Sequence, residues 1–353
     1  MRLSNFSVNN DEHIFNLTTR IGIYQFARKT VANKKYGYSI DDQARALILA
    51  LFLFQKKKKR KYLNLAEIYL NFIQRAQRRD GYFHNFANAQ GKFIDKTGSQ
   101  DSFGRSIWAL GVCQRYGTKA IKLKAEKIFH RALKNIIKLR YLRSKAYALL
   151  GLLYLSQEDE IGKISRRIAN FMLKKFKENS HKNWQFFENK LVYANAILPY
   201  ASLLSYNYFP NPEYKKIGLK TLDFLNQACC FKNFPAPIGN QGWYERGGKK
   251  ALLDPQPIDA GDMVLAAGEA FSLTKDKKYI KMMRDWFAWF FGHNTYGFVF
   301  YDQKTGGCHD GIREEKLNPD EGAESTIIFH LANLAIKKLS KKNEQSQKEK
   351  SEY

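Results

Sequence analysis

Apolar residues recur at every third or fourth position along almost the whole of this chain. Apolar side chains recur at i, i+3, i+4 and i+7, whereas the two-residue alternation of a half-buried strand is scarce. The pattern predicts about twelve helices, separated by segments that contain Gly, Pro or Asn. The expected helices cover residues 12–26, 41–55, 61–77, 101–115, 119–138, 143–155, 159–177, 189–207, 212–229, 255–273, 277–291 and 321–340.

Every second expected helix differs from its neighbours in two ways. It is apolar on most faces, as in ALILALFLF (46–54) and SIWALGV (106–112), which indicates a buried helix. It also begins at a motif rich in carboxylates, aromatic residues and Gly, whereas the helices between begin with Lys, Glu and Leu. These motifs are GYSIDDQARA (37–46), GSQDSFGRSIW (98–108), RYLRSKAY (140–147), NWQFFENKLVYAN (183–195), LLDPQPIDAGD (252–262) and LNPDEGAES (317–325).

Six buried helices that alternate with six outer ones predict an all-α fold, a closed (α/α)6 toroid of six helical hairpins. The inner helices then run in one direction, so that the six motifs meet on one face. A helical solenoid would show a recognisable repeat, which is absent. No Pro- or Ser-rich linker divides residues 11–336, which predicts a single domain there. Residues 1–10 are expected to form an arm, and the basic, apolar-poor segment 337–353 a disordered tail.

The composition indicates which partners the protein can bind and in which cellular compartment it is expected. The 59 Lys and Arg against 33 Asp and Glu give a net charge of +26, which predicts attraction to polyanions. No nucleic-acid-binding motif accompanies this charge, so we expect no specific nucleic-acid partner. The four scattered cysteines do not form a disulfide framework, and the N-terminus MRLSNFSVNNDEHIF has no apolar signal core, which together predict a cytoplasmic protein. No apolar stretch has the length of a membrane span.

The chemistry that the motifs support is carbohydrate chemistry. In glycoside hydrolysis one carboxyl group protonates the leaving oxygen, and a second activates water or attacks the anomeric carbon. Trp and Tyr rings stack on pyranose faces, and Asp, Asn, Gln and Arg bind hydroxyl groups. Asp101 and Glu324 are the expected catalytic pair, with Asp42, Glu188, Asp254 and Asp310 as secondary candidates. The expected substrate-binding residues are Asp41, Arg45, His84, Asn85, Arg105, Trp184, Tyr193, Asn195, Trp243, Arg246, Gln256, Asp259 and His309.

Structural roles compete with these assignments. Asp41, Asp42 and Asp101 stand at helix starts, where a cap contributes about 1 kcal/mol. Glu324 stands in a helix that is otherwise apolar, where a lone carboxylate is costly, so a functional role is favoured. Cys308-His309-Asp310 has metal-ligand residue types but no second spaced pair, and the Gly-rich segment 239–248 lacks a nucleotide-binding context. We therefore expect neither a metal nor another cofactor.

Eight motifs in order resemble a bacterial family of six-hairpin glycosidase-like proteins, whose members often accompany or are fused to glycosyltransferases. They are GYSIDDQARAL, DGYFHNF, GSQDSFGRSIWALG, WQFFEN with YANAILPYA, GNQGWYERGG, DPQPIDA, TGGCHDG and EGAEST. The resemblance covers residues 11–336 and implies an (α/α)6 toroid, a carbohydrate substrate and a glycosyltransferase partner. Asp101, Asn195, Asp254, Asp310 and Glu324 match the family pattern. Gln43, Ala194, Pro255 and Glu321 depart from it, which leaves the substrate preference open.

Three functions follow from these observations. The first is a glycoside hydrolase that acts on an oligosaccharide or polysaccharide. The second is a sugar epimerase or lyase on the same toroid, with His84 or His309 and Tyr193 as proton-transfer groups. The third is a non-catalytic glycan-binding module that serves a glycosyltransferase.

Overall fold

The computed structural model describes residues 8, 10–155, 160–313 and 315–351, and this part of the chain is mostly helical. The helices are α1 Glu12–Leu17, α2 Ile40–Lys57, α3 Arg60–Ala76, α4 Gln100–Tyr116, α5 Lys119–Ile136, α6 Leu142–Leu153, α7 Glu160–Asn179, α8 Ile197–Tyr208, α9 Pro212–Ala228, α10 Pro257–Thr274, α11 Lys277–Ala288 and α12 Ala323–Ser351. Antiparallel strand pairs occur in the loops: β1 Ala27–Arg28 with β2 Val31–Ala32, β3 Tyr38–Ser39 with β4 Phe86–Ala87, β5 Lys190–Leu191 with β8 Tyr244–Glu245, β6 Cys230–Phe231 with β7 Phe234–Pro235, and β9 Ile312–Arg313 with β10 Lys316–Leu317.

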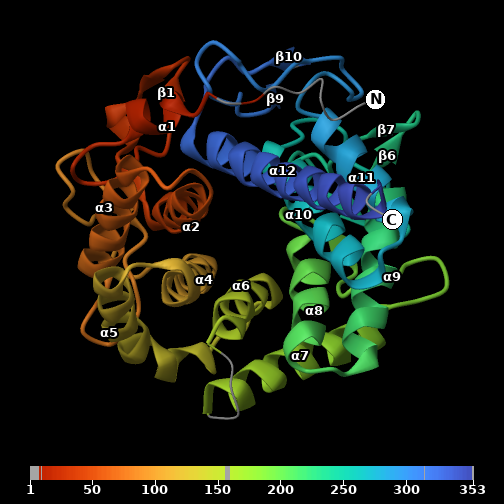
Figure 1. Cartoon of the computed structure of the whole chain (residues 1–353), viewed down its shortest axis with the longest axis horizontal. Coiled ribbons are helices and arrows are strands. Elements are labelled where there is room, and N and C mark those ends of the chain that lie inside the picture. Colours follow the sequence, from red (N-terminus) through yellow and green to blue (C-terminus); the bar gives the residue numbers. More distant parts are fainter. Residues whose placement is uncertain (1–7, 9, 156–159, 314, 352–353) are drawn as a thin grey trace.

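The helices form two concentric rings. The inner ring runs α2, α4, α6, α8, α10 and α12, each packed on the next, and α12 returns to α2 and closes it. Helices α3, α5, α7, α9 and α11 pack outside, each against the inner helix that precedes it or, for α11, against α10 and α12 (Figure 1). The short α1 packs on α12 and completes the sixth hairpin. The predicted (α/α)6 toroid is confirmed.

Burial follows the two sequence patterns. In α2, Ala44 to Leu51 are buried without interruption, because other helices surround this segment. In α3 only one face is buried, on which Tyr69, Phe72 and Ile73 lie, and the charged residues point outward. The sequence therefore predicted correctly which helices of this pair are inner and outer.

Helices α4 and α6 approach each other backbone to backbone. A Cβ on Gly111 would lie 2.1 Å from the carbonyl oxygen of Gly151, and one on Gly151 would lie 2.2 Å from that of Ile107. Gly104 is equally restricted, by the carbonyl of Ser144. Only glycine fits at such contacts, so these residues fix how closely α4 packs on α6 along their length.

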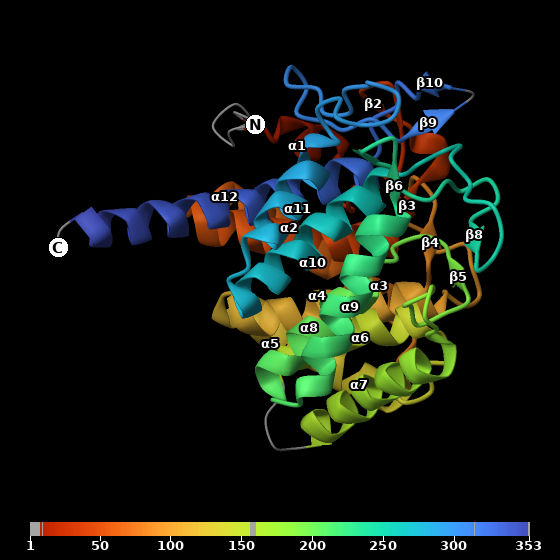
Figure 2. The ribbon, with the colours of Figure 1, turned by 90° about the vertical axis from the view of Figure 1, so that its right-hand side faces the viewer.

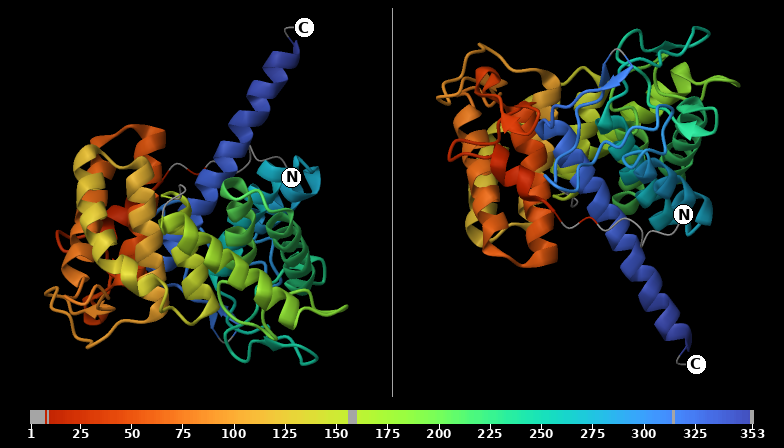
Figure 3. Two further views of the ribbon diagram at one scale, coloured as in Figure 1. Left: turned by 90° about the horizontal axis from the view of Figure 1, so that it is seen from below. Right: turned by 90° about the horizontal axis from the view of Figure 1, so that it is seen from above.

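The loops that carry the motifs lie on one face of the ring. Figure 2 shows β3, β4, β5 and β8 on the side where the inner helices begin. The last turns of α12 project from the opposite side (Figure 3). The predicted convergence of the inner-helix N-termini is therefore observed.

Helix α1 ends at Leu17, not near residue 26 as the periodicity predicts. The hydroxyl of Thr18 donates to the carbonyl of Ile14, and the hydroxyl of Thr19 accepts from the amide of Ile21. Such side-chain to backbone bonds compete with helix continuation. Residues 18–39 instead form turns, the β1–β2 hairpin and a short 3₁₀ turn, Lys34–Tyr36.

Two other helices also have different bounds. Helix α8 begins at Ile197 rather than near residue 189, because Ala194 has a positive φ of 47° and the side chain of Asn195 accepts from the amide of Val192. Helix α12 extends to Ser351, whereas the composition of residues 337–353 predicts a disordered tail. Lys, Gln and Glu are good helix formers, and the segment continues a helix that is already nucleated.

Two further points concern the chain ends and the membrane. Of the predicted arm at residues 1–10, residues 1–7 and 9 lie outside the described residues. Within the described part of the chain, no helix combines the length and apolar character that crossing a bilayer requires.

Candidate functional site

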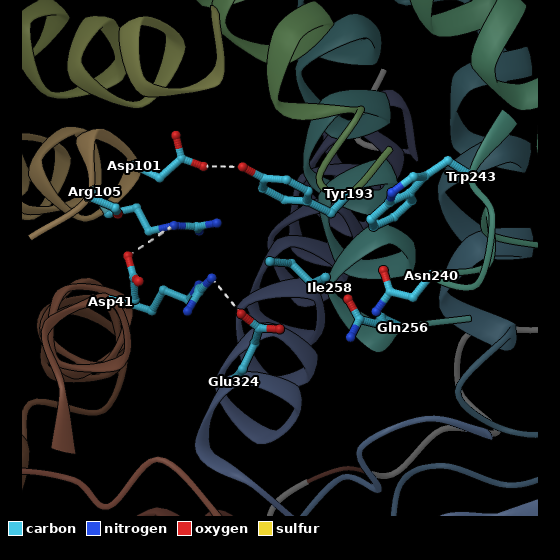
Figure 4. A pocket seen from close by; sticks show the side chains of 11 residues that line it. Asp41, Asp101, Arg105, Tyr193, Asn240, Trp243, Gln256, Ile258 and Glu324 are labelled. Carbon is cyan, nitrogen blue, oxygen red and sulfur yellow. Dashed lines mark hydrogen bonds and ion pairs between the residues drawn. The ribbon is translucent and has the colours of Figure 1, made fainter. Parts of the chain in front are cut away.

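A pocket of about 340 Å³ opens where the inner helices begin. Figure 4 shows two kinds of lining. Carboxylates and arginines from α2, α4 and α12 occupy one side, and aromatic and amide side chains from the loops before α8 and α10 occupy the other. The lining residues are Asp41, Arg45, Ser99, Asp101, Arg105, Tyr193, Asn240, Trp243, Gln256, Ile258 and Glu324.

Asp101 is held by two hydroxyl groups. Its Oδ1 accepts a hydrogen bond from Ser144 at 2.5 Å, and its Oδ2 accepts one from Tyr193, also at 2.5 Å. The cap of α4 is Ser99, whose hydroxyl accepts from the amide of Ser102. The alternative that Asp101 serves as this cap is therefore wrong, and its carboxylate faces the pocket.

Glu324 stands in the first turn of α12 and forms an ion pair with the neighbouring inner helix α2. Its Oε2 lies 2.5 Å from Nη2 of Arg45, whose Nη1 lies 3.2 Å from Oδ1 of Asp42. The cap of α2 is Ser39, which accepts from the amide of Asp42. Arg45 therefore bridges the starts of α2 and α12 and orients Glu324 toward the pocket.

Arg105 lies between two pocket carboxylates. Its Nε is 3.4 Å from Oδ1 of Asp41, and its guanidinium lies over the ring of Tyr147 at 4.0 Å. Burial disfavours its charge, but the field of Tyr147, Asp41, Glu324 and Asp101 outweighs burial and raises its pKa above the ordinary value. Arg105 is therefore a permanent positive charge in the pocket.

Three carboxyl groups lie behind the pocket wall, fully buried. Burial raises the pKa of Asp42 to about 7, although Arg45 opposes the shift. Burial, together with the neighbouring Asp262, raises the pKa of Asp259 to about 8. Burial raises the pKa of Asp262 to about 7 against the effect of Arg105 and Arg45. Asp42 and Asp259, predicted as site residues, thus lie beneath the pocket and not on its surface.

Arg143, a residue that its motif alone does not single out, positions the loop of Tyr193. Its Nε donates to the carbonyl of Tyr193 at 2.7 Å, its Nη1 to Glu188 at 2.6 Å, and its Nη2 to Oδ1 of Asn195 at 2.9 Å. The motif RYLRSKAY predicts an inner-helix start and carries none of the predicted site residues. It supplies Arg143, Ser144 and Tyr147, all of which contact the pocket residues. Glu188 and Asn195 are therefore support residues of the loop.

Two predicted carboxylates have structural surroundings. Asp310 accepts from the amide of Gly322 at 2.9 Å and from Ser325, so it fixes the start of α12, and burial raises its pKa to about 7. Asp254 stands in a turn with a positive φ of 59°, and burial raises its pKa. Neither residue lines the pocket.

Several predicted sugar contacts also lie away from the pocket. Trp184 is buried in the core, where it packs edge-on against Phe224 and Tyr244. Its Nε1–H donates to the carbonyl of Glu188. The prediction that its ring stacks on a sugar is therefore wrong. Arg246 donates to the carbonyl of Asn179.

The remaining predicted contacts stand on the 76–98 loop and before α12. The ring of His84 lies parallel to Phe93, and its Nδ1 is 2.8 Å from the carbonyl oxygen of Asp95. Asn85 accepts from the hydroxyl of Ser102, one residue from Asp101. Neither His84, Asn85 nor His309 lines the pocket.

Within the described part of the chain, no cluster of three or more His, Cys, Asp or Glu residues could hold a metal ion. Cys308 is buried, which raises the pKa of its thiol, and Asp310 is engaged with α12. The expectation of a cofactor-free site stays a prediction.

No family model and no curated protein matches the chain significantly. Solved structures do. Cellobiose 2-epimerase from Bacillus thermoamylovorans B4167 matches with a TM-score of 0.72 and 13% identity, over 94% of this chain and 96% of that one. D-mannose isomerase matches with a TM-score of 0.74 and 12% identity, over 93% and 95%. A family 76 glycoside hydrolase from a bovine Bacteroides thetaiotaomicron strain matches with a TM-score of 0.61 and 10% identity, over 93% and 77%.

These proteins share the (α/α)6 toroid, so the comparisons confirm the fold that the resemblance implied. They are sugar-processing enzymes with different reactions. At this identity they establish the fold alone, and the association with a glycosyltransferase stays a prediction.

Proposed function

We propose that the protein is a carbohydrate-active enzyme that hydrolyses a glycosidic bond in an oligosaccharide or polysaccharide. The observation that carries this proposal is the placement of Asp101 and Glu324, which enter one pocket from two inner helices, α4 and α12. Tyr193 and Trp243 stand on the far side, with ring centroids 6.2 Å apart, and offer faces for a pyranose ring. The reaction needs two carboxyl groups beside the scissile bond, and the aromatic rings add a surface on which the sugar can stack.

The two carboxyl groups have different contacts, which suggests a division of roles. Both oxygens of Asp101 accept hydroxyl hydrogen bonds, so this group is oriented as an acceptor and suits the nucleophile or base. Among the described residues Glu324 makes its contact through Oε2, to Arg45, which leaves Oε1 for the substrate. Glu324 is assigned as the donor of the proton to the leaving oxygen, and in this role it carries the proton on Oε1 while Oε2 accepts from Arg45.

An epimerase or isomerase is the second candidate, because the cellobiose 2-epimerase and the D-mannose isomerase match with higher TM-scores than the hydrolase. That reaction moves a proton at a carbon atom and needs a base beside the substrate. Of the proton-transfer residues predicted for it, Tyr193 lines the pocket but His84 and His309 do not. The pocket chemistry therefore favours hydrolysis.

The test compares D101N, E324Q and D310N with the wild type on a panel of bacterial oligosaccharides. We expect D101N and E324Q to lower kcat by about 10²–10⁴-fold while the melting temperature stays close to that of the wild type. D310N is the control: Asp310 supports α12 from behind, so D310N should lower the melting temperature and retain turnover when folded. Full activity of both D101N and E324Q would refute the assignment.

Product analysis separates the alternatives. Hydrolysis creates new reducing ends and shorter chains, which mass spectrometry detects. A change of sugar identity at constant mass would instead establish the epimerase or isomerase. Binding of a glycan with no change in product would establish the binding module.

A further inference from the structure

Residues 18–39 connect α1 to α2, and we name this segment the rim hairpin. The amide of Ala323 donates to the carbonyl of Gln25 at 3.1 Å, and the amide of Glu321 to that of Lys29 at 2.9 Å. At its other end, Ser39 caps α2 two residues before Asp41. The rim hairpin is thus anchored next to Glu324 and Asp41, both of which line the pocket.

Two aromatic rings stand exposed on the rim hairpin. Phe26 is 43% exposed and Tyr36 is 49% exposed, and their rings pack edge to face at 5.1 Å. The amide of Asn33 donates to the carbonyl of Phe26, and the side chain of Gln25 donates to that of Tyr36. Rigid, exposed rings lose little conformational entropy when they bind a flat apolar face.

The rim hairpin is also strongly basic. Residues 18–39 contain Arg20, Arg28, Lys29, Lys34 and Lys35 but no Asp or Glu, and all five side chains are exposed. No ion pair to any of the five is found among the described residues. Some surface cations elsewhere are paired with a carboxylate, as in Lys278–Asp223 and Lys281–Asp285. The positive charge of the rim hairpin is therefore open to a ligand.

Like the rim hairpin, the pocket contains a positively charged side chain, that of Arg105. Arg45, Arg105 and Arg143 stand at the starts of three successive inner helices. Arg45 bonds to Asp42 and Glu324, and Arg143 uses Nε, Nη1 and Nη2. Arg105 is only 5% exposed, yet within the described part of the chain its sole polar contact is the 3.4 Å approach of Nε to Asp41. Figure 4 shows the end of its side chain directed into the pocket.

We propose that the rim hairpin is a second glycan-binding subsite and that its ligand is an anionic polysaccharide whose chain continues from the pocket. Phe26 and Tyr36 pack on sugar rings, and Arg28, Lys29 and Lys35 bind the anionic groups. Arg105 presents a planar guanidinium to the anionic group of the sugar unit in the pocket. The direction of the chain rests on the proposed function, whereas binding at the rim hairpin does not require catalysis.

Three polymers with one backbone test the ligand chemistry: dextran, carboxymethyl dextran and dextran sulfate. Binding of the full chain is measured by biolayer interferometry at about 150 mM salt, where weak surface charge effects are screened. We expect one or both anionic polymers to bind at least about tenfold more tightly than dextran, and their order identifies carboxylate or sulfate. Equal binding of all three would overturn the proposal, and so would tighter binding of duplex DNA than of either anionic polymer.

Matched variants locate the subsite. F26A/Y36A should weaken binding of the preferred anionic polymer about tenfold, whereas F231A/F234A should leave it within about twofold. The control changes two similarly exposed Phe residues on the β6–β7 hairpin, at another part of the ring. R28Q/K29Q should also weaken binding more than K119Q/K127Q, which removes the same charge from the exposed face of α5. Equal losses in rim and control variants would show non-specific attraction to a cationic protein and overturn the proposal.

The test of the rim subsite can succeed or fail independently of the test of hydrolysis. If no glycan is turned over but the rim variants lose binding selectively, the subsite stands without the hydrolase. If short oligosaccharides are hydrolysed and the rim variants bind polymer as the wild type does, the hydrolase stands without the subsite.

Discussion

Replacing Asp262 by Asn should make the protein less sensitive to alkaline pH. Asp262 is buried on α10, its Oδ2 has no hydrogen-bond partner among the described residues, and burial raises its pKa to about 7. An unfolded Asp has a pKa of about 3.9, so between these two values the folded state holds a proton that the unfolded state has released. The free energy of unfolding that Asp262 contributes therefore falls as pH rises from about 4 through 7.

The magnitude follows from linkage. With pKa values of about 7 folded and about 3.9 unfolded, ionisation of Asp262 lowers the free energy of unfolding by about 2–3 kcal/mol between pH 5 and 8. For a chain of 353 residues, an unfolding entropy of about 2.1 cal/mol/K per residue converts this into a melting-temperature change of roughly 3 °C. Asn has the same shape and does not ionise, so D262N should not show this loss of melting temperature between pH 5 and pH 8.

The assay is differential scanning calorimetry of wild type, D262N and the control E126Q at pH 5 and pH 8. Asp42, Asp259 and Asp310 also have raised pKa values and lower the wild-type stability in the same direction, so the quantity compared is the difference between variant and wild type. The gap should widen in favour of D262N at pH 8, while E126Q, an exposed change on α5, should follow the wild type. A constant gap between D262N and wild type at both pH values would refute the reasoning.

The remaining predictions concern the supports of the pocket. G111A should lower the free energy of unfolding, measured by urea titration, by about 2–3 kcal/mol, because the new Cβ would lie 2.1 Å from the carbonyl oxygen of Gly151. The control is G268A, whose Cβ meets only the flexible end of Met283 at 3.2 Å. G268A should be neutral or stabilising in the same titration. R143Q should raise KM more than it lowers kcat, since it frees the loop of Tyr193. It should also cost about 2–3 kcal/mol, because it removes the ion pair with Glu188 and one of the hydrogen bonds to Asn195. An unchanged KM in R143Q would contradict the positioning role.

The sequence alone determined the helical toroid and the face on which its site lies. Apolar periodicity depends on each helix and its immediate surroundings, so the inner helix α2 and the outer helix α3 could be distinguished from their residues. The same reasoning placed Asp101, Glu324, Arg105 and Tyr193 in one pocket, because parallel inner helices bring their starts together.

Only the tertiary structure decided which residues of the motifs face the pocket. Trp184 and Asp310 have the residue types of a sugar site, but contacts with Phe224 and with the amide of Gly322 commit them to the core and to the start of α12. Arg143, by contrast, became a support of the site through bonds to residues 45 to 52 positions away. Local patterns fix the helices and their order, whereas the direction of a polar side chain depends on partners that are distant in sequence, and these become neighbours only when the ring closes.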